Sequence, residues 1–209
     1  MGLLVAGFNY AAVNAGEFND WYDTEHVPER SSVPGFINAE RWVGSDDPKV
    51  SVATYDLQSL DVLRSPPYRA IAYENLSPWS KRMVGRCQRI CRFEAEQTVP
   101  GGLAAPVEAA GLLLSAMNVD PAVEADFNDW YETEHLPQLS QVSGCLAARR
   151  FRVTSGAQRY LALYHLTGPE VVASKAWEAV AATPWTLRLR PHICDRLRLV
   201  LRRYRRDAA

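Results

Sequence analysis

The chain has 209 residues, a length that suits one large domain or two domains of about 100 residues each. Hydrophobic residues make up 47% of it, yet no apolar run reaches the roughly 18 residues of a membrane span, and no signal peptide is recognisable. The formal net charge of -1 gives no electrostatic reason to expect a nucleic-acid or membrane partner. The four cysteines form no CxxC pair, so we expect free thiols in a reducing cytoplasm.

The first hundred residues show a pattern of apolar alternation and breaks that predicts the element order βαββαβ. This order is typical of a ferredoxin-like unit, in which helices cover one face of a four-stranded antiparallel sheet. In chain order we expect a strand at 3–10, a helix at 15–32 that bends near Pro28, strands at 35–43 and 50–57 joined by a turn at 45–49, a broken helical stretch at 60–82, and a strand at 87–97.

A repeat relates the two halves of the chain. Residues 18–28, FNDWYDTEHVP, match residues 127–137, FNDWYETEHLP, at nine of eleven positions with an offset of 109. A second motif, SPWSKR at 77–82, matches TPWTLR at 183–188 with an offset of 106. We interpret this as a tandem duplication. The predicted division is a first ferredoxin-like repeat at 1–100, a second at 107–209 and a linker with Pro and Gly at 98–106; the second repeat is expected to begin with a strand at 111–119 and to end with an arginine-rich strand at 196–206.

Each predicted sheet has one face under helices and one bare face. Because an exposed apolar sheet face needs cover, we expect the two α+β units to press their bare faces together. The result would be an intrachain, pseudo-dimeric α/β barrel that encloses a space reached by one imidazole from each half. Whether two such chains pair further as a homodimer stays open.

The Trp-Tyr-x-Thr-Glu-His cluster carries the side chains that suggest chemistry. Histidine titrates near neutral pH, and Tyr, Asn or Arg donors can hold an oxyanion while a proton is removed next to a carbonyl. These roles predict a binding cavity for a small hydrophobic or aromatic ligand. The candidate catalytic residues are His26, His135, Tyr22 and Tyr131, and the candidate substrate-binding residues are Asn9, Asn118, Trp21, Trp130, Arg82 and Arg188.

Structural roles compete with these assignments. Trp21 fits core packing as well as ligand contact, and a histidine at a helix end can be a satisfied structural residue. Glu25 fits a salt bridge, with Arg41 as a candidate partner. Ser77 and Thr183, each followed by Pro-Trp, resemble helix N-caps.

The segments FNDWYDTEHVPE and FNDWYETEHLPQ, together with PGFINAERW at 34–42, resemble the EthD-like branch of the dimeric α/β-barrel superfamily. The resemblance covers most of both halves and implies the barrel fold, with His26 and His135 at the position of the family's helix histidine. Members of the wider superfamily include cofactor-free monooxygenases, polyketide cyclases, muconolactone isomerases, dehydratases and haem enzymes. The family usually has one unit per chain, whereas this chain carries both.

Two classes of function remain. The first is a cofactor-independent enzyme of isomerase, cyclase, dehydratase (lyase) or oxygenase type, which uses His-assisted proton transfer on a small apolar or aromatic carbonyl compound. The second is a non-catalytic ligand-binding or accessory protein with the barrel interior as its pocket. We expect no cofactor and no metal site, because HExxH and other ligand spacings are missing. Haem is disfavoured because His165 and His192 have no match in the first half.

Overall fold

A computed structural model describes residues 1–206. The first half contains β1 (Gly2–Asn9), α1 (Ala15–Trp21), the π-helical turn η1 (Tyr22–His26), α2 (Val27–Ser31), β2 (Glu40–Gly44), β3 (Val50–Leu57), η2 (Leu60–Arg64), α3 (Pro66–Arg69), η3 (Tyr73–Asn75), α4 (Pro78–Arg86) and β4 (Gln88–Val99). The second half contains β5 (Gly111–Val119), η4 (Pro121–Val123), α5 (Glu124–Trp130), the π-helical turn η5 (Tyr131–His135), α6 (Leu136–Ser140), β6 (Cys145–Ser155), β7 (Tyr160–Leu166), η6 (Pro169–Ala173), α7 (Lys175–Val180), α8 (Pro184–Leu189), η7 (Arg190–His192) and β8 (Ile193–Arg203).

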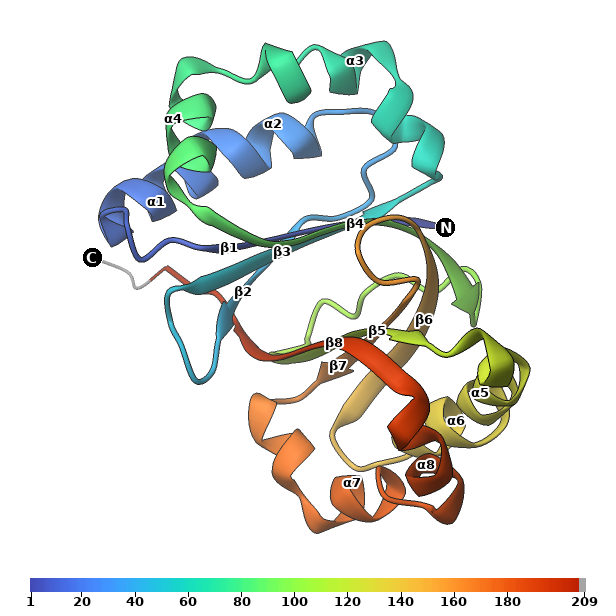
Figure 1. Cartoon of the computed structure of the whole chain (residues 1–209). Helices are drawn as coiled ribbons and strands as arrows, with labels where there is room; N and C mark the ends of the chain where they lie inside the picture. Colours follow the sequence, from blue (N-terminus) through green and yellow to red (C-terminus); the bar gives the residue numbers. More distant parts are fainter. Residues whose placement is uncertain (207–209) are drawn as a thin grey trace.

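The eight strands close into one antiparallel barrel with the helices outside it (Figure 1). Each half contributes a four-stranded sheet, in the order β4-β1-β3-β2 and β8-β5-β7-β6. The seams between the sheets are β2 with β8, where Trp42 pairs with Arg203, and β4 with β6, where Gln97 pairs with Phe151. The predicted fold class, two ferredoxin-like βαββαβ units packed as an intrachain α/β barrel, is confirmed.

The helix predicted at 15–32 is continuous, but its irregularity comes before Pro28. Residues 22–26 form a π-helical turn, and Pro28, which has no N–H to donate, follows it directly in the first turn of α2. The second strand begins at Glu40, five residues later than predicted. The delay follows from Gly35, whose φ of 100° belongs to a turn and not to a strand.

The barrel interior is filled by side chains, which corrects the expectation of an enclosed space there. Strand alternation sends one set of residues inward, and these pack into a single apolar core that includes Leu3, Val5, Trp42 and Phe151. The opposite set, such as Leu4, packs under the helices of its own half. Any cavity beside the motif histidines therefore lies between helices and sheet, outside the barrel.

One end of the barrel interior holds buried charges. Arg149 donates to Asp56 at 2.7 Å, and both side chains are almost fully buried. The Arg149 guanidinium also contacts His165 Nε2 at 2.9 Å and donates to the Leu103 carbonyl at 3.1 Å. Asp56 accepts a further bond from the Ala105 amide at 2.7 Å. The segment that follows β4 is thus fixed across this end of the barrel by charged groups from both halves.

Candidate functional site

The π-helical turn decides which residues of the motif face each other. A π-helix bonds residues five apart, so side chains at i and i+5 come to one face. The Trp21 and His26 rings accordingly lie 4.5 Å apart, and the Trp130 and His135 rings lie 4.3 Å apart. Tyr22, which α-helical spacing predicts as a neighbour of His26, also contacts it, with ring centres 5.1 Å apart. The turn therefore supports each imidazole on an indole.

A hydrogen-bonded chain joins the first motif to the second. Trp21 Nε1 donates to Ser80 Oγ at 3.0 Å, and the hydroxyls of Ser80 and Ser77 donate to Glu25 Oε1 at 2.9 and 2.6 Å. Glu25 therefore binds α4 and not Arg41, which corrects the expected salt bridge. Ser77 caps α4, as predicted. The second half repeats the arrangement with Trp130, Thr186, Thr183 and Glu134.

Tyr22 and Tyr131 belong to a second structural cluster. Arg41 donates to Asp23 at 2.5 Å and lies 4.3 Å from the centre of the Tyr22 ring. Arg150 lies in the same way 4.6 Å from the Tyr131 ring. Tyr22 is fully buried, and burial raises the pKa of its hydroxyl to about 12. Neither tyrosine lines the cavities described below, so the predicted catalytic role does not fit their positions.

Four of the predicted substrate-binding residues lie away from the cavities. Asn9 accepts from the Ala11 amide, and Asn118 accepts from the Arg159 amide, so both amides organise turns. Arg82 and Arg188 are exposed on α4 and α8. They form surface ion pairs with Glu17 at 3.0 Å and with Asp126 at 2.9 Å respectively. Both arginines were predicted as substrate-binding residues, and the structure places them on the exposed surface of these helices.

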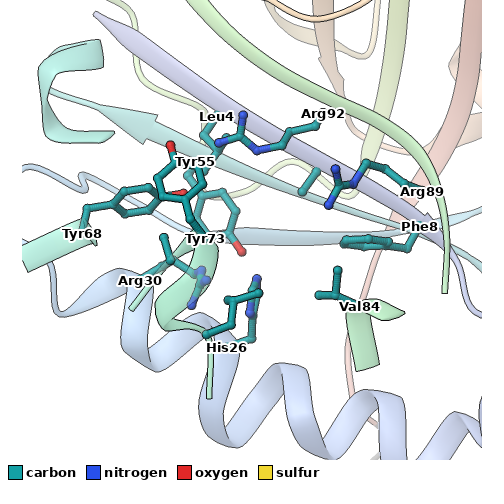
Figure 2. A pocket seen from close by; sticks show the side chains of 13 residues that line it. Leu4, Phe8, His26, Arg30, Tyr55, Tyr68, Tyr73, Val84, Arg89 and Arg92 are labelled. Carbon is teal, nitrogen blue, oxygen red and sulfur yellow. The ribbon is translucent and has the colours of Figure 1, made fainter. Parts of the chain in front are cut away.

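His26 lies at the floor of a cavity of about 280 Å³ between the helices of the first half and strands β1, β3 and β4 (Figure 2). Most of the wall is apolar or aromatic, and arginines supply the charge. The lining residues are Leu4, Ala6, Phe8, His26, Arg30, Tyr55, Tyr68, Ala72, Tyr73, Leu76, Val84, Arg89 and Arg92.

Burial and two cations keep His26 neutral. Its side chain is only 7% exposed, and Nδ1 has no hydrogen-bond partner among residues 1–206. Burial first, then Arg30 and Arg41, hold the pKa of His26 well below its usual value of 6.5. Arg30 follows one turn later on α2 and donates to Glu29 at 2.9 Å and to the Ile71 carbonyl at 3.3 Å. A neutral imidazole thus sits beside a fixed guanidinium.

The residues that sequence reasoning missed come from the strands and from α2. Arg92 donates to Glu94 at 2.7 Å, while its Nη2 is buried without a partner in the described chain. Tyr55 and Tyr68 stand on the same side of the cavity as Arg30 in Figure 2. The repeat gave a sequence signal for two of these residues. Tyr55 matches Tyr164 at the offset of 109, and Arg92 matches Arg198 at the offset of 106.

The second half has a related cavity of about 350 Å³, with His135 and Trp130 in its wall. Burial lowers the pKa of His135 to about 4, so this imidazole is also neutral at pH 7. The remaining lining residues are Leu113, Ser115, Met117, Leu139, Tyr164, Val172, Trp177, Glu178, Ala181, Thr186, Arg190, Ile193, Arg196 and Arg198.

The two cavities, of about 280 and 350 Å³, lie at the lower limit of small-molecule sites. Across residues 1–206, His, Cys, Asp and Glu side chains nowhere gather in threes in a way that could hold a metal ion. No helix in that range has the length and apolar character needed to cross a bilayer.

Comparison with known proteins identifies the fold. No family model matches the sequence, and no curated protein matches it. Among solved structures, an anthrone oxidase-like protein shares 12% identity at a TM-score of 0.65, covering 98% of this chain and 92% of the other. A monooxygenase-like protein from Fusobacterium nucleatum subsp. nucleatum shares 9% identity at a TM-score of 0.62, with coverage of 98% and 92%. A chlorite dismutase from Candidatus Nitrospira defluvii shares 10% identity at a TM-score of 0.59, with coverage of 98% and 91%. These proteins and this chain share the eight-stranded α/β barrel.

Proposed function

We propose that the His26 cavity binds a small apolar or aromatic carbonyl compound and that His26 moves a proton on it without a bound cofactor. The observation that carries this proposal is a neutral, buried imidazole at the floor of an apolar and tyrosine-lined cavity, one helical turn from Arg30. The structural neighbours described as anthrone oxidase-like and monooxygenase-like support the proposal by similarity of fold alone. We also infer that the halves arose by tandem duplication and that the chain is EthD-like, on the repeated motif.

The proposed step begins with a carbonyl compound whose oxygen lies toward the guanidinium groups of the cavity. The neutral imidazole of His26 takes a proton from the carbon next to the carbonyl, and the electron pair of that C–H bond moves to form an enolate. Arg30 and Arg92 then stabilise the enolate oxygen, and the imidazolium forms an ion pair with it. With a β,γ-unsaturated substrate, the imidazolium returns the proton to the γ carbon of the dienolate and completes an isomerisation. With a β-hydroxy substrate, the imidazolium gives the proton to the hydroxyl, which leaves as water while the enolate electrons form the new C=C bond, and this completes a dehydration.

Ligand binding without turnover is the second candidate function. One observation favours it: burial and the two nearby cations hold the pKa of His26 so far below 6.5 that the free imidazole is a weak base. Proton transfer is most efficient when the pKa of the base lies near the working pH. The enzyme hypothesis therefore requires that the developing enolate offset this unfavourable electrostatic environment.

The test is solvent deuterium exchange, measured by proton NMR in D₂O on a panel of enolisable aromatic carbonyl compounds such as 2-tetralone and ethyl benzoylacetate. We expect the wild-type protein to accelerate loss of the signal from the proton next to the carbonyl. The variant His26→Ala should lower that rate by about 10²- to 10⁴-fold. The matched variant His135→Ala, at the same position of the second half, should leave it unchanged.

Two further measurements separate the hypotheses. The variant Ala6→Phe fills the cavity from β1, and it should abolish both ligand binding and exchange. Binding that is lost in Ala6→Phe, with no exchange by the wild type, would establish a ligand-binding protein and reject the enzyme. Exchange that survives in both Ala6→Phe and His26→Ala would show that the reaction takes place elsewhere.

A further inference from the structure

We propose that the cavity of the second half is a separate site, which binds a small molecule carrying a carboxylate or a phosphate on a partly apolar body. This inference goes beyond the function proposed for the His26 cavity and does not depend on it. It is carried by three arginines that line the second cavity and that have no acidic partner within ion-pairing distance in residues 1–206.

The three arginines come from two adjoining elements. Arg190 belongs to η7, and Arg196 and Arg198 point to the same side of β8 because they are two residues apart on a strand. None of the three has an acidic group within ion-pairing distance in residues 1–206, whereas most other arginines around the helices do. Their guanidinium groups are therefore available to an incoming oxyanion.

Comparison with the first cavity, which also has three lining arginines, shows how the arginines differ in position. At the offset of 106, Arg190 and Arg196 correspond to Val84 and Ile90, and at the offset of 109 the polar Ser115 corresponds to Ala6. Arg190 thus replaces the neutral Val84 of the first wall, whereas Arg30 and Arg89 of that wall correspond to Leu139 and Asp195, so the three arginines of the second cavity are differently placed and not more numerous.

The second half has also lost the carboxylate that pairs with a cavity arginine in the first half. Arg92 in the first half is paired with Glu94 at 2.7 Å. The corresponding residues in the second half are Arg198 and Val200, so Arg198 lacks this carboxylate. Burial and the neighbouring Arg196 lower the pKa of Arg198, and the charge of Asp46 offsets only part of this effect. An anionic ligand would relieve that repulsion.

The acidic groups near the cavity do not cancel its charge. Glu178 from α7 lines the wall, and Asp46, on the turn between β2 and β3, acts on Arg198 from a longer distance. His135 is neutral at pH 7 because burial lowers its pKa to about 4. Three guanidinium groups therefore share the wall with one carboxylate, that of Glu178, and the site keeps a net positive charge.

The remaining wall defines the rest of the ligand. Leu113, Leu139 and Trp177 are apolar, so the ligand needs an apolar part beside its oxyanion. Leu139 also replaces Arg30 of the first half, which removes the cation next to the histidine. The second cavity thus places its positive charge on β8 and η7, on the sheet side, and leaves His135 in an apolar setting.

The experiment uses the full chain with three probes: inorganic phosphate, phenyl phosphate and benzoate. Binding is followed by two-dimensional NMR of the indole N–H groups, with sodium chloride at equal ionic strength as the baseline. We expect saturable shifts of the Trp177 and Trp130 indole signals, and tighter binding of the two aromatic probes than of phosphate. Stronger binding of phenyl phosphate would identify a phosphate ligand, and stronger binding of benzoate a carboxylate ligand.

Two variants decide the outcome. The double variant Arg196→Gln/Arg198→Gln should weaken binding by about tenfold or more, because it removes two charge-assisted contacts. The matched variant Arg188→Gln removes an exposed arginine of the same half and should bind as the wild type does. The inference is overturned if no probe binds saturably, or if the double variant and Arg188→Gln bind equally well. His26→Ala should not alter binding, so failure here is distinct from failure of the proposed reaction.

Discussion

Acidification should destabilise this protein through His135. The perturbation is a change from pH 7 to pH 5 in the wild type and in His135→Gln. Burial lowers the pKa of His135 in the folded chain to about 4, from its usual value of 6.5. Between these two values the unfolded chain binds more protons than the folded chain, so the free energy of unfolding falls as the pH falls. The stabilising contribution is complete above pH 6.5 and is lost progressively toward pH 4.

The magnitude follows from those two pKa values. At pH 5 an unfolded imidazole with a pKa of 6.5 is almost fully protonated, whereas the folded one with a pKa of about 4 is almost fully neutral. The linkage relation then gives a loss of about 2 kcal/mol between pH 7 and pH 5 from this one residue. His26 and His165 change stability in the same direction, since burial lowers both of their pKa values.

The assay is urea unfolding, followed by tryptophan fluorescence at pH 7, 6 and 5. His135→Gln should lose about 2 kcal/mol less than the wild type over this range, because glutamine does not titrate. The free energy of unfolding of His135→Gln at pH 7 can differ from that of the wild type, since the contact with Trp130 changes. The test is the difference between the two proteins in how steeply this free energy falls with pH. Parallel pH profiles for the two proteins would show that His135 is not held neutral in the fold.

Two further predictions concern stability. Arg149→Met leaves the carboxylate of Asp56 buried in the barrel without its cation, and it should cost about 3–5 kcal/mol in the free energy of unfolding; a loss below 1 kcal/mol by urea denaturation would contradict the buried ion pair. Ser80→Ala removes the acceptor of Trp21 Nε1 and one donor to Glu25, and it should cost about 1–3 kcal/mol. An unchanged melting temperature for Ser80→Ala would show that this chain of hydrogen bonds does not join α4 to the motif.

The strands and the barrel could be predicted from the sequence because their signals are local. Alternation alone located the strands at 50–57 and 111–119 with the bounds that the structure has. The need to cover two bare sheet faces then gave the barrel. The π-helical turn could not be predicted in this way, because its sequence looks like that of an ordinary α-helix. The sequence identified Tyr22 as a neighbour of His26, which the structure bears out, but it missed the second neighbour, Trp21, which the π-helical turn adds.

The site was predicted only in its helical part. His26 and His135 were identified from the repeated motif, and both line cavities. The other predicted residues were chosen as repeated donors that could hold an oxyanion, but Asn9 and Asn118 organise turns, and Arg82 and Arg188 form surface ion pairs. Glu25 and Ser77 hold α4, and Arg41 holds the motif helix. A repeated motif therefore contains residues that give both halves the same fold, and the histidine of the cavity is only one of them.

The sequence by itself determined the element order, the two related halves and the histidine that each half carries, because each of these depends on residues that are close along the chain. Only the tertiary structure decided which side chains meet those histidines. Arg30, Tyr55 and Arg92 come from three separate elements, and they share a cavity because the sheet order places β3 and β4 on either side of β1 under α2. The location of the cavities outside the barrel was decided in the same way, since large side chains from both halves already fill its interior.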